Sequence, residues 1–111
     1  MDKSEMDIRE GTISFWVQPG NIVFNDNKVT PLVELNPKNG SIFMVKDSDN
    51  KLKFFHVYLG KGRTDVEYDV TSLDPAIKHM FAVTWSLKNE RIVMYVDGKS
   101  VSEAAINYSY P

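Results

Sequence analysis

Residues 11–19 read GTISFWVQP, and this stretch decides the fold. Every second residue is apolar, and the set that would share one face is Ile13, Phe15 and Val17. The opposite face would take Thr12, Ser14 and Trp16. A period of two is typical of a β-strand with one buried face, because successive side chains point to opposite sides. Pro19 ends the pattern, since proline has no N–H to donate to a neighbouring strand.

The same period returns along the chain and predicts eight or nine short strands. They cover residues 12–18, 32–35, 42–45, 52–59, 65–70, 80–86, 91–96, 99–102 and, as the ninth, 104–110. The pairs Asn39-Gly40 and Asp97-Gly98 predict hairpins with type I′ turns, where both central residues need a positive φ. One short helical turn is expected near residues 73–79. Many short strands separated by turn residues indicate an all-β, antiparallel two-sheet sandwich of the jelly-roll type.

The alternation also predicts which side chains fill the core. Besides the set from residues 12–18, the inward residues of the later strands are Val83, Trp85, Ile92, Met94 and Val96. In residues 52–59 the inward set is predicted to be Phe55, Val57 and Leu59. That register sends Phe54, His56 and Tyr58 outward.

Composition restricts the function classes. With 111 residues the chain is expected to form one domain, residues 1–111, with residues 1–10 as a candidate disordered lead-in. The net charge is −2 and the charges of both signs are interspersed, which argues against a nucleic-acid partner. There is no cysteine, so disulfides and thiolate metal sites are excluded. No apolar run is long enough to span a membrane, and the charged N-terminus does not read as a signal peptide.

Two parts of the chain resemble a known family. Residues 11–19 resemble the opening strand of laminin G-like domains, which belong to the concanavalin A-like lectin folds. Residues 79–85 (HMFAVTW) and 91–99 (RIVMYVDGK) resemble the paired later strands of the same domains. The resemblance implies a surface or extracellular module that binds sugars, proteins or lipids. Such domains usually continue with a further long strand that pairs near the first one, and here only residues 102–111 remain to supply it.

We therefore expect a non-catalytic recognition module for carbohydrate or for a surface protein partner. Outward aromatic side chains are the candidate contacts, because exposed apolar patches of soluble proteins tend to mark interaction sites. The candidate contact residues are Trp16, Phe54, His56, Tyr58 and Tyr95. The alternative is a structural domain that forms homo-oligomers through this face or through an unpaired sheet edge.

Two further sites have weaker support in the sequence. Asp47, Asp49 and Asn50 form an oxygen-rich turn that could bind calcium, although a complete ligand set does not follow it. Glu67 and Asp69 match the first two acids of a glucanase motif, but Ser72 stands where its third acid belongs. We therefore expect no glycosidase activity. His56 and His79 accompany no recognisable nucleophile motif, so both are expected to be ordinary structural residues.

Overall fold

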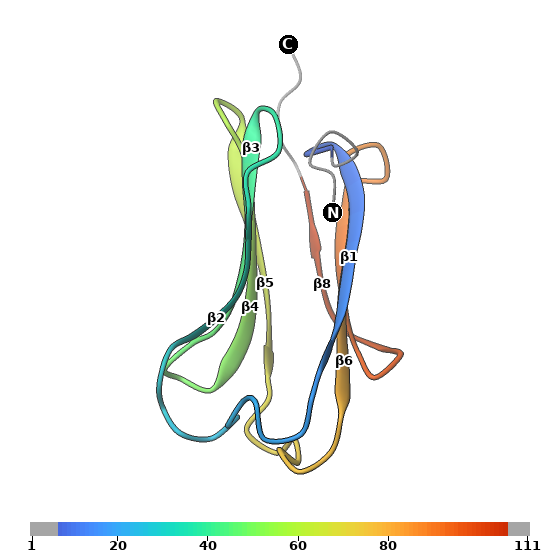
Figure 1. Cartoon of the computed structure of the whole chain (residues 1–111). Helices are drawn as coiled ribbons and strands as arrows, with labels where there is room; N and C mark the ends of the chain where they lie inside the picture. The colour runs from blue at the N-terminus through green and yellow to red at the C-terminus, as the bar shows by residue number, and fades with distance from the viewer. Residues whose placement is uncertain (1–6, 107–111) are drawn as a thin grey trace.

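The computed structural model describes residues 7–106, which form two four-stranded antiparallel sheets packed face to face (Figure 1). The strands are β1 (Glu10–Val17), β2 (Thr30–Leu35), β3 (Gly40–Lys46), β4 (Lys51–Tyr58), β5 (Gly62–Asp69), β6 (His79–Ser86), β7 (Arg91–Val96) and β8 (Lys99–Ala105). One sheet has the strand order β1-β6-β7-β8, and the other has the order β2-β3-β4-β5. Residues 18–29 and 70–78 carry the chain from one sheet to the other. The predicted all-β antiparallel sandwich is confirmed.

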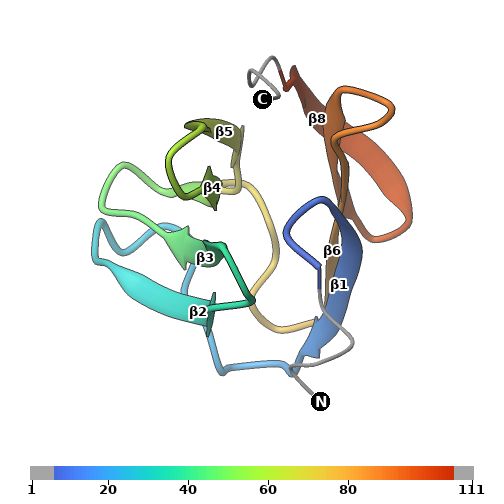
Figure 2. The same ribbon diagram turned by 90° about the horizontal axis from the view of Figure 1, so that it is seen from above.

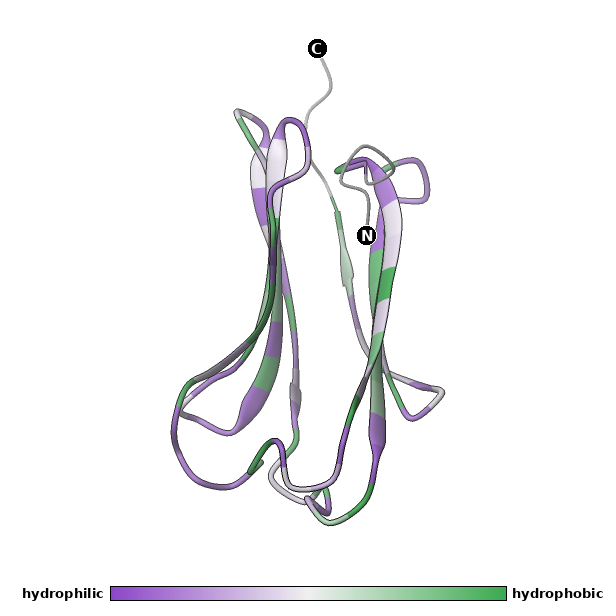
Figure 3. Ribbon diagram, in the orientation of Figure 1, coloured by the Kyte–Doolittle hydropathy of each residue, from purple (hydrophilic) through white to green (hydrophobic). Residues whose placement is uncertain are grey.

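Period-two patterning builds the inner face of the β1-β6-β7-β8 sheet. Hydropathy alternates along β1 in Figure 3, as it must for a strand with one face in the core. The predicted inward residues Ile13, Val17, Val83, Trp85, Ile92, Met94 and Val96 are all buried. Phe15 is half-buried against the same core. The predicted core of this sheet is confirmed.

The prediction for residues 52–59 is wrong by one position. The inward residues of β4 are Leu52, Phe54 and His56, all fully buried. The outward residues are Phe55 and Val57, and the ring of Phe55 stacks on that of Phe43 with a centroid distance of 5.9 Å. Leu59 lies beyond the strand and is exposed. Both alternating sets contain large apolar side chains, so the pattern does not determine which set is buried.

Residues 7–10 close the end of the sandwich at which β1 begins (Figure 1). Nε2 of His56 donates to the carbonyl oxygen of Ile8 at 2.7 Å, and Nε1 of Trp85 donates to that of Asp7 at 3.0 Å. Ile8 is buried against Gly40, where an added Cβ would lie 2.4 Å from the Ile8 side chain. Residues 7–10 therefore pack against both sheets.

The two predicted type I′ turns have different outcomes. Asp97 and Gly98 have φ angles of 53° and 84° and join β7 to β8 in a two-residue hairpin, as predicted. Asn39 has a φ of 69°, but Gly40 is already the first residue of β3, so the type I′ assignment there is wrong. The connection is the four-residue loop 36–39. The glycine is needed for space against Ile8 and the Val57 carbonyl rather than for its own φ angle.

Two smaller predictions also need correction. Residues 73–79 contain turns and no helix, because the Ala76 amide bonds to the Asp74 side chain and His79 already begins β6. The predicted last two strands are one continuous strand, β8, which ends at Ala105. Residues 107–110 of the predicted ninth strand lie outside the described residues. Within residues 7–106, no helix is long and apolar enough to cross a membrane.

Candidate functional site

The outer face of the β1-β6-β7-β8 sheet is rich in hydroxyl groups. Cross-strand pairing places Thr12, Thr84, Val93 and Glu103 in one row, and Ser14, Ala82, Tyr95 and Ser100 in the next. Ser86 and Arg91 are paired in the row beyond Thr84, and Trp16 is paired with Met80 in the row beyond Tyr95. We call this surface the hydroxyl-rich face; its members are Thr12, Ser14, Trp16, Thr84, Ser86, Arg91, Val93, Tyr95, Ser100 and Glu103.

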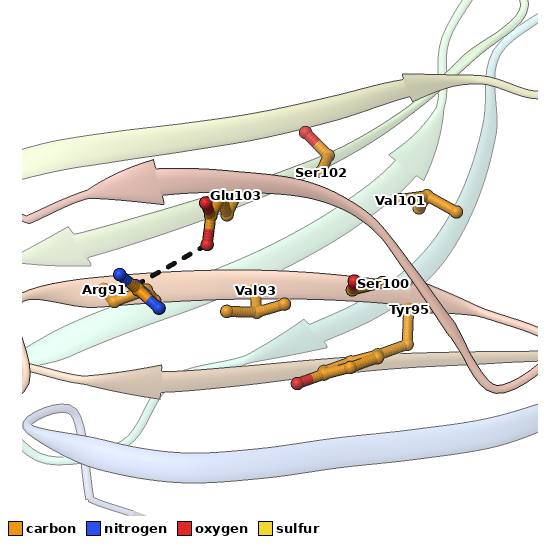
Figure 4. A pocket seen from close by; sticks show the side chains of 7 residues that line it. All are labelled: Arg91, Val93, Tyr95, Ser100, Val101, Ser102 and Glu103. Carbon is orange, nitrogen blue, oxygen red and sulfur yellow. Dashed lines mark ion pairs between the residues drawn. The ribbon is translucent and has the colours of Figure 1, made fainter.

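A hollow of ≈ 420 Å³ lies over β7 and β8 on this face (Figure 4). Arg91, Val93 and Tyr95 line it from β7, and residues 100–103 line it from β8. Nε of Arg91 lies 3.6 Å from a carboxylate oxygen of Glu103, and both side chains are largely exposed. Because this ion pair is exposed, it adds little to stability, and its donors and acceptors remain accessible to a ligand.

A second hollow of ≈ 250 Å³ adjoins the first across Arg91 and Val93. Its lining residues from β1, β6 and the following turn include Thr12, Thr84, Ser86 and Asn89. The hydroxyl group of each Ser and Thr can both donate and accept a hydrogen bond. The two hollows share Arg91 and Val93 and together span the four strands.

Two aromatic side chains lie on this face, of which Tyr95 lines the first hollow and Trp16 lies one row farther along the sheet. Tyr95 is half-buried in the first hollow, with its ring lying along the sheet (Figure 4). Trp16 is 56% exposed, and Nζ of Lys78 lies 4.5 Å from its ring centroid. A cation above an aromatic face contributes about 0.5–1 kcal/mol at an exposed site. The ammonium group of Lys78 thus covers one face of the Trp16 ring.

The predicted contact residues do not form one surface. Trp16 and Tyr95 lie on the hydroxyl-rich face, as the alternation predicted. Phe54 and His56 are fully buried between the sheets, and Tyr58 is half-buried against the same core, so the prediction of an outward position is wrong for this strand. Phe54 stacks on Trp85 with ring centroids 5.8 Å apart, which shows that it belongs to the core.

Four residues that line the first hollow were not among the predicted contacts: Arg91, Val93, Ser100 and Glu103. Arg91 and Val93 lie on the same side of β7 as Tyr95, so the alternation along this strand places them on the face. Ser100 and Glu103 could not be found in this way. A register shift between Met94 and Tyr95 breaks the alternation of β8 relative to its neighbour, and such a bulge is invisible in the sequence.

A lysine forms ion pairs with both carboxylates of the predicted calcium turn. Nζ of Lys53 lies 3.0 Å from a carboxylate oxygen of Asp47 and 3.0 Å from one of Asp49. Asn50 instead pairs with Asn27, whose amide donates to the Asn50 side-chain oxygen at 2.9 Å. No cluster of three or more His, Cys, Asp or Glu side chains that could hold a metal occurs among residues 7–106. Lys53 supplies the positive charge between these carboxylates.

The glucanase-like acids lie on a different sheet from the hollows. Glu67 and Asp69 are exposed on β5, and Glu67 pairs with Lys51 at 3.3 Å. The Thr71 hydroxyl and amide donate to Asp69 and hold the pKa of its carboxyl below the ordinary value. A general acid in glycoside hydrolysis needs a raised pKa, so the environment of Asp69 does not suit that role.

Comparison with solved structures identifies the fold. The chain is similar to the mouse laminin alpha1 chain, domains LG4-5, with a TM-score of 0.66 and 24% sequence identity. The match covers 95% of this chain and 26% of that chain, so this chain spans about a quarter of the laminin fragment. No protein-family model and no curated protein matches the sequence. The two sheets therefore form a concanavalin A-like jelly roll of the laminin G type.

Proposed function

We propose that this domain is a non-catalytic recognition module that binds carbohydrate on the hydroxyl-rich face. The observation that carries the proposal is the pair of adjoining hollows, with Tyr95 lining the first of them. Small-ligand sites are concave and combine apolar or aromatic surface with a few convergent polar groups. This face combines both features in one place.

The chemistry of the lining matches a neutral sugar. A sugar presents hydroxyl groups that donate and accept hydrogen bonds, and the face offers matching groups on Thr12, Thr84 and Ser100. The Arg91–Glu103 pair supplies charged donors and acceptors, whose hydrogen bonds are stronger than those between neutral groups. The C–H surface of a pyranose ring would lie on Tyr95.

The resemblance to laminin G-like domains supports a binding role and an extracellular or cell-surface setting. The fold itself is compatible with many functions, so the assignment depends on the face rather than on the architecture. A surface protein partner is the second candidate. Its support is Trp16, whose exposed ring is of the type that protein interfaces often bury.

A glycan array tests the proposal with three variants. Tyr95→Ala is expected to weaken binding to the best glycan about tenfold or more, ~1.4 kcal/mol, because it removes the stacking surface. Trp16→Ala tests the extension of the site toward β1. Phe55→Ala is the matched control, since Phe55 is a half-buried aromatic residue on the outer face of the other sheet.

The outcomes separate the candidates. Loss of glycan binding in Tyr95→Ala but not in Phe55→Ala supports the proposed face. Equal loss in both variants, or no signal from the wild-type protein on any glycan, contradicts a carbohydrate site there. An array without signal, together with capture of a surface protein that Trp16→Ala abolishes, would favour the protein partner.

A further inference from the structure

The four edge strands of the sandwich are not equally protected against pairing with another chain. An exposed edge presents unpaired N–H and C=O groups, and proteins usually protect it with proline, charge or a bulge. β2 has Pro31 and a register shift beside it, and β8 pairs with β7 across a register shift and carries Lys99 and Glu103. The outward positions of β5 are charged; they are Arg63, Asp65, Glu67 and Asp69.

β1 has none of these protections. Its only charged residue is Glu10, the first, and Gly11–Val17 is uncharged and contains no proline. All eight residues of β1 pair with β6 in one unbroken register. Within residues 7–106, no strand pairs with the other side of β1. This edge is thus a free, regular template for a further strand.

The side of the sandwich next to β1 is also less well closed. On the opposite side β5 lies against β8, where the two sheets meet (Figure 2). Next to β1, four of the apolar side chains that pack against the core are only partly buried, although Ile13 and Val17 of β1 are buried. The four are Phe15 on β1 and Leu32, Val33 and Leu35 on β2. Apolar area that remains in contact with water favours association.

We propose that β1 pairs with β1 of a second copy of this chain, antiparallel and about a two-fold axis at Ser14. Gly11–Val17 is centred on Ser14, so this register pairs the whole uncharged run with itself and leaves Glu10 outside it. Directly opposed residues share a face of the sheet, so Trp16 meets Thr12 of the second copy, and Phe15 meets Ile13.

A second copy fits this edge better than an isolated peptide strand does. The two-fold axis brings the open sides of both copies together, so the partly buried residues of β1 and β2 from each copy would cover one another. An isolated peptide strand would pair with the backbone of β1 but would leave the partly buried side chains of β2 in contact with water. A closed two-fold pair also leaves no further free β1 edge on which a fibre could grow.

Cross-linking provides a direct test because the chain has no cysteine. In Ser14→Cys the two thiols would face each other, and directly opposed residues of antiparallel strands have Cα atoms about 4.5–5.5 Å apart, within disulfide range. Mild oxidation is expected to convert Ser14→Cys to a disulfide dimer. Ser100→Cys is the matched control, an exposed serine on β8 at the other edge of the same sheet.

Light scattering of the unmodified protein completes the test. The expected mass is twice the 12.7 kDa of one chain, and Ser14→Lys, which places two like charges on the axis, is expected to return it to 12.7 kDa. A circular dichroism melt shows whether that variant remains folded. A monomeric wild-type protein at high concentration, or equal oxidation of the two cysteine variants, would overturn the inference. Neither readout depends on a glycan, so the proposed carbohydrate site stands or falls separately.

Discussion

His79 joins three parts of the chain through one buried ring. Its Nδ1 lies 2.7 Å from a carboxylate oxygen of Asp97, and its Nε2 lies 2.7 Å from the carbonyl oxygen of Asp74. The ring of Phe24 meets it edge-on at 5.6 Å. Both partner atoms are acceptors, so only the protonated imidazolium can donate to both. Burial opposes this charge, but the bonds to Asp97 and Asp74 outweigh it and raise the pKa of His79 above 6.5.

The stability of the domain should therefore fall as the solution becomes more alkaline. Because the pKa of His79 is raised on folding, its stabilising effect is complete below pH 6.5 and is lost as the pH rises through the folded-state value. His79→Gln is expected to destabilise the protein by about 1–3 kcal/mol at pH 6 and to flatten this alkaline decline. Urea titrations of both proteins across this pH range measure the effect.

His56 provides the internal control for this measurement. Burial lowers the pKa of His56 below 6.5, so its contribution is present above that pH and is lost as the pH falls. This acid-side decline should persist in His79→Gln. If the alkaline decline is as steep in the variant as in the wild-type protein, His79 is not its cause.

Sequence reasoning could identify these histidines but not their environments. It treated both as ordinary structural residues, yet the acceptors of His79 come from a loop and a hairpin turn, and the acceptor of His56 is 48 positions away. Such partners are set by the packing of the two sheets. Patterning within one strand carries no information about them.

At the scale of elements, the crossing segment 18–29 is attached to the other sheet by polar contacts. Lys46 is fully buried at the end of β3, and its Nζ donates to the Asp26 carboxylate and to the Lys28 carbonyl. The Lys46 ammonium beside Asp26 keeps the pKa of that carboxyl below its ordinary value. Asn27 adds a reciprocal pair of bonds with Asn50 in the β3–β4 turn.

Removing the buried ammonium group should loosen this segment. Lys46→Met keeps most of the side-chain volume but leaves the Lys28 carbonyl without its donor, and we expect the melting temperature to fall by about 5–15 °C. Lys53→Met is the control, because its ion pairs lie at the surface and should contribute less than about 4 °C. Equal losses in the two variants would show that Lys46 has no special role.

The positions of the strands were largely predictable. Which face of each strand is buried was less predictable. β1 and β6 alternate over most of their length between large apolar and polar or small residues, which favours burial of one face. β4 has large side chains on both faces, and a one-residue change of register exchanges them. The burial of His56 is decided by the Ile8 carbonyl, a contact that no local pattern contains.

At the scale of the whole molecule, two surfaces of the same sheet have different proposed roles. The hydroxyl-rich face covers its outer side, and the unprotected edge of β1 borders it. In a β1-paired dimer the two faces would form one continuous eight-stranded surface. Two sites on one rigid sheet would strengthen attachment to a dense glycan layer without any change in the contacts of either site.

The most direct test of the carbohydrate face is a ¹H–¹⁵N NMR titration of the wild-type protein with the glycan that gives the strongest array signal. The chemical-shift changes are expected to cluster at the amides of Val93, Tyr95, Ser100 and Glu103, which line the first hollow. Changes centred on the turn at residues 47–50 or on Phe43 and Phe55 would contradict the account. So would a spectrum that no glycan alters.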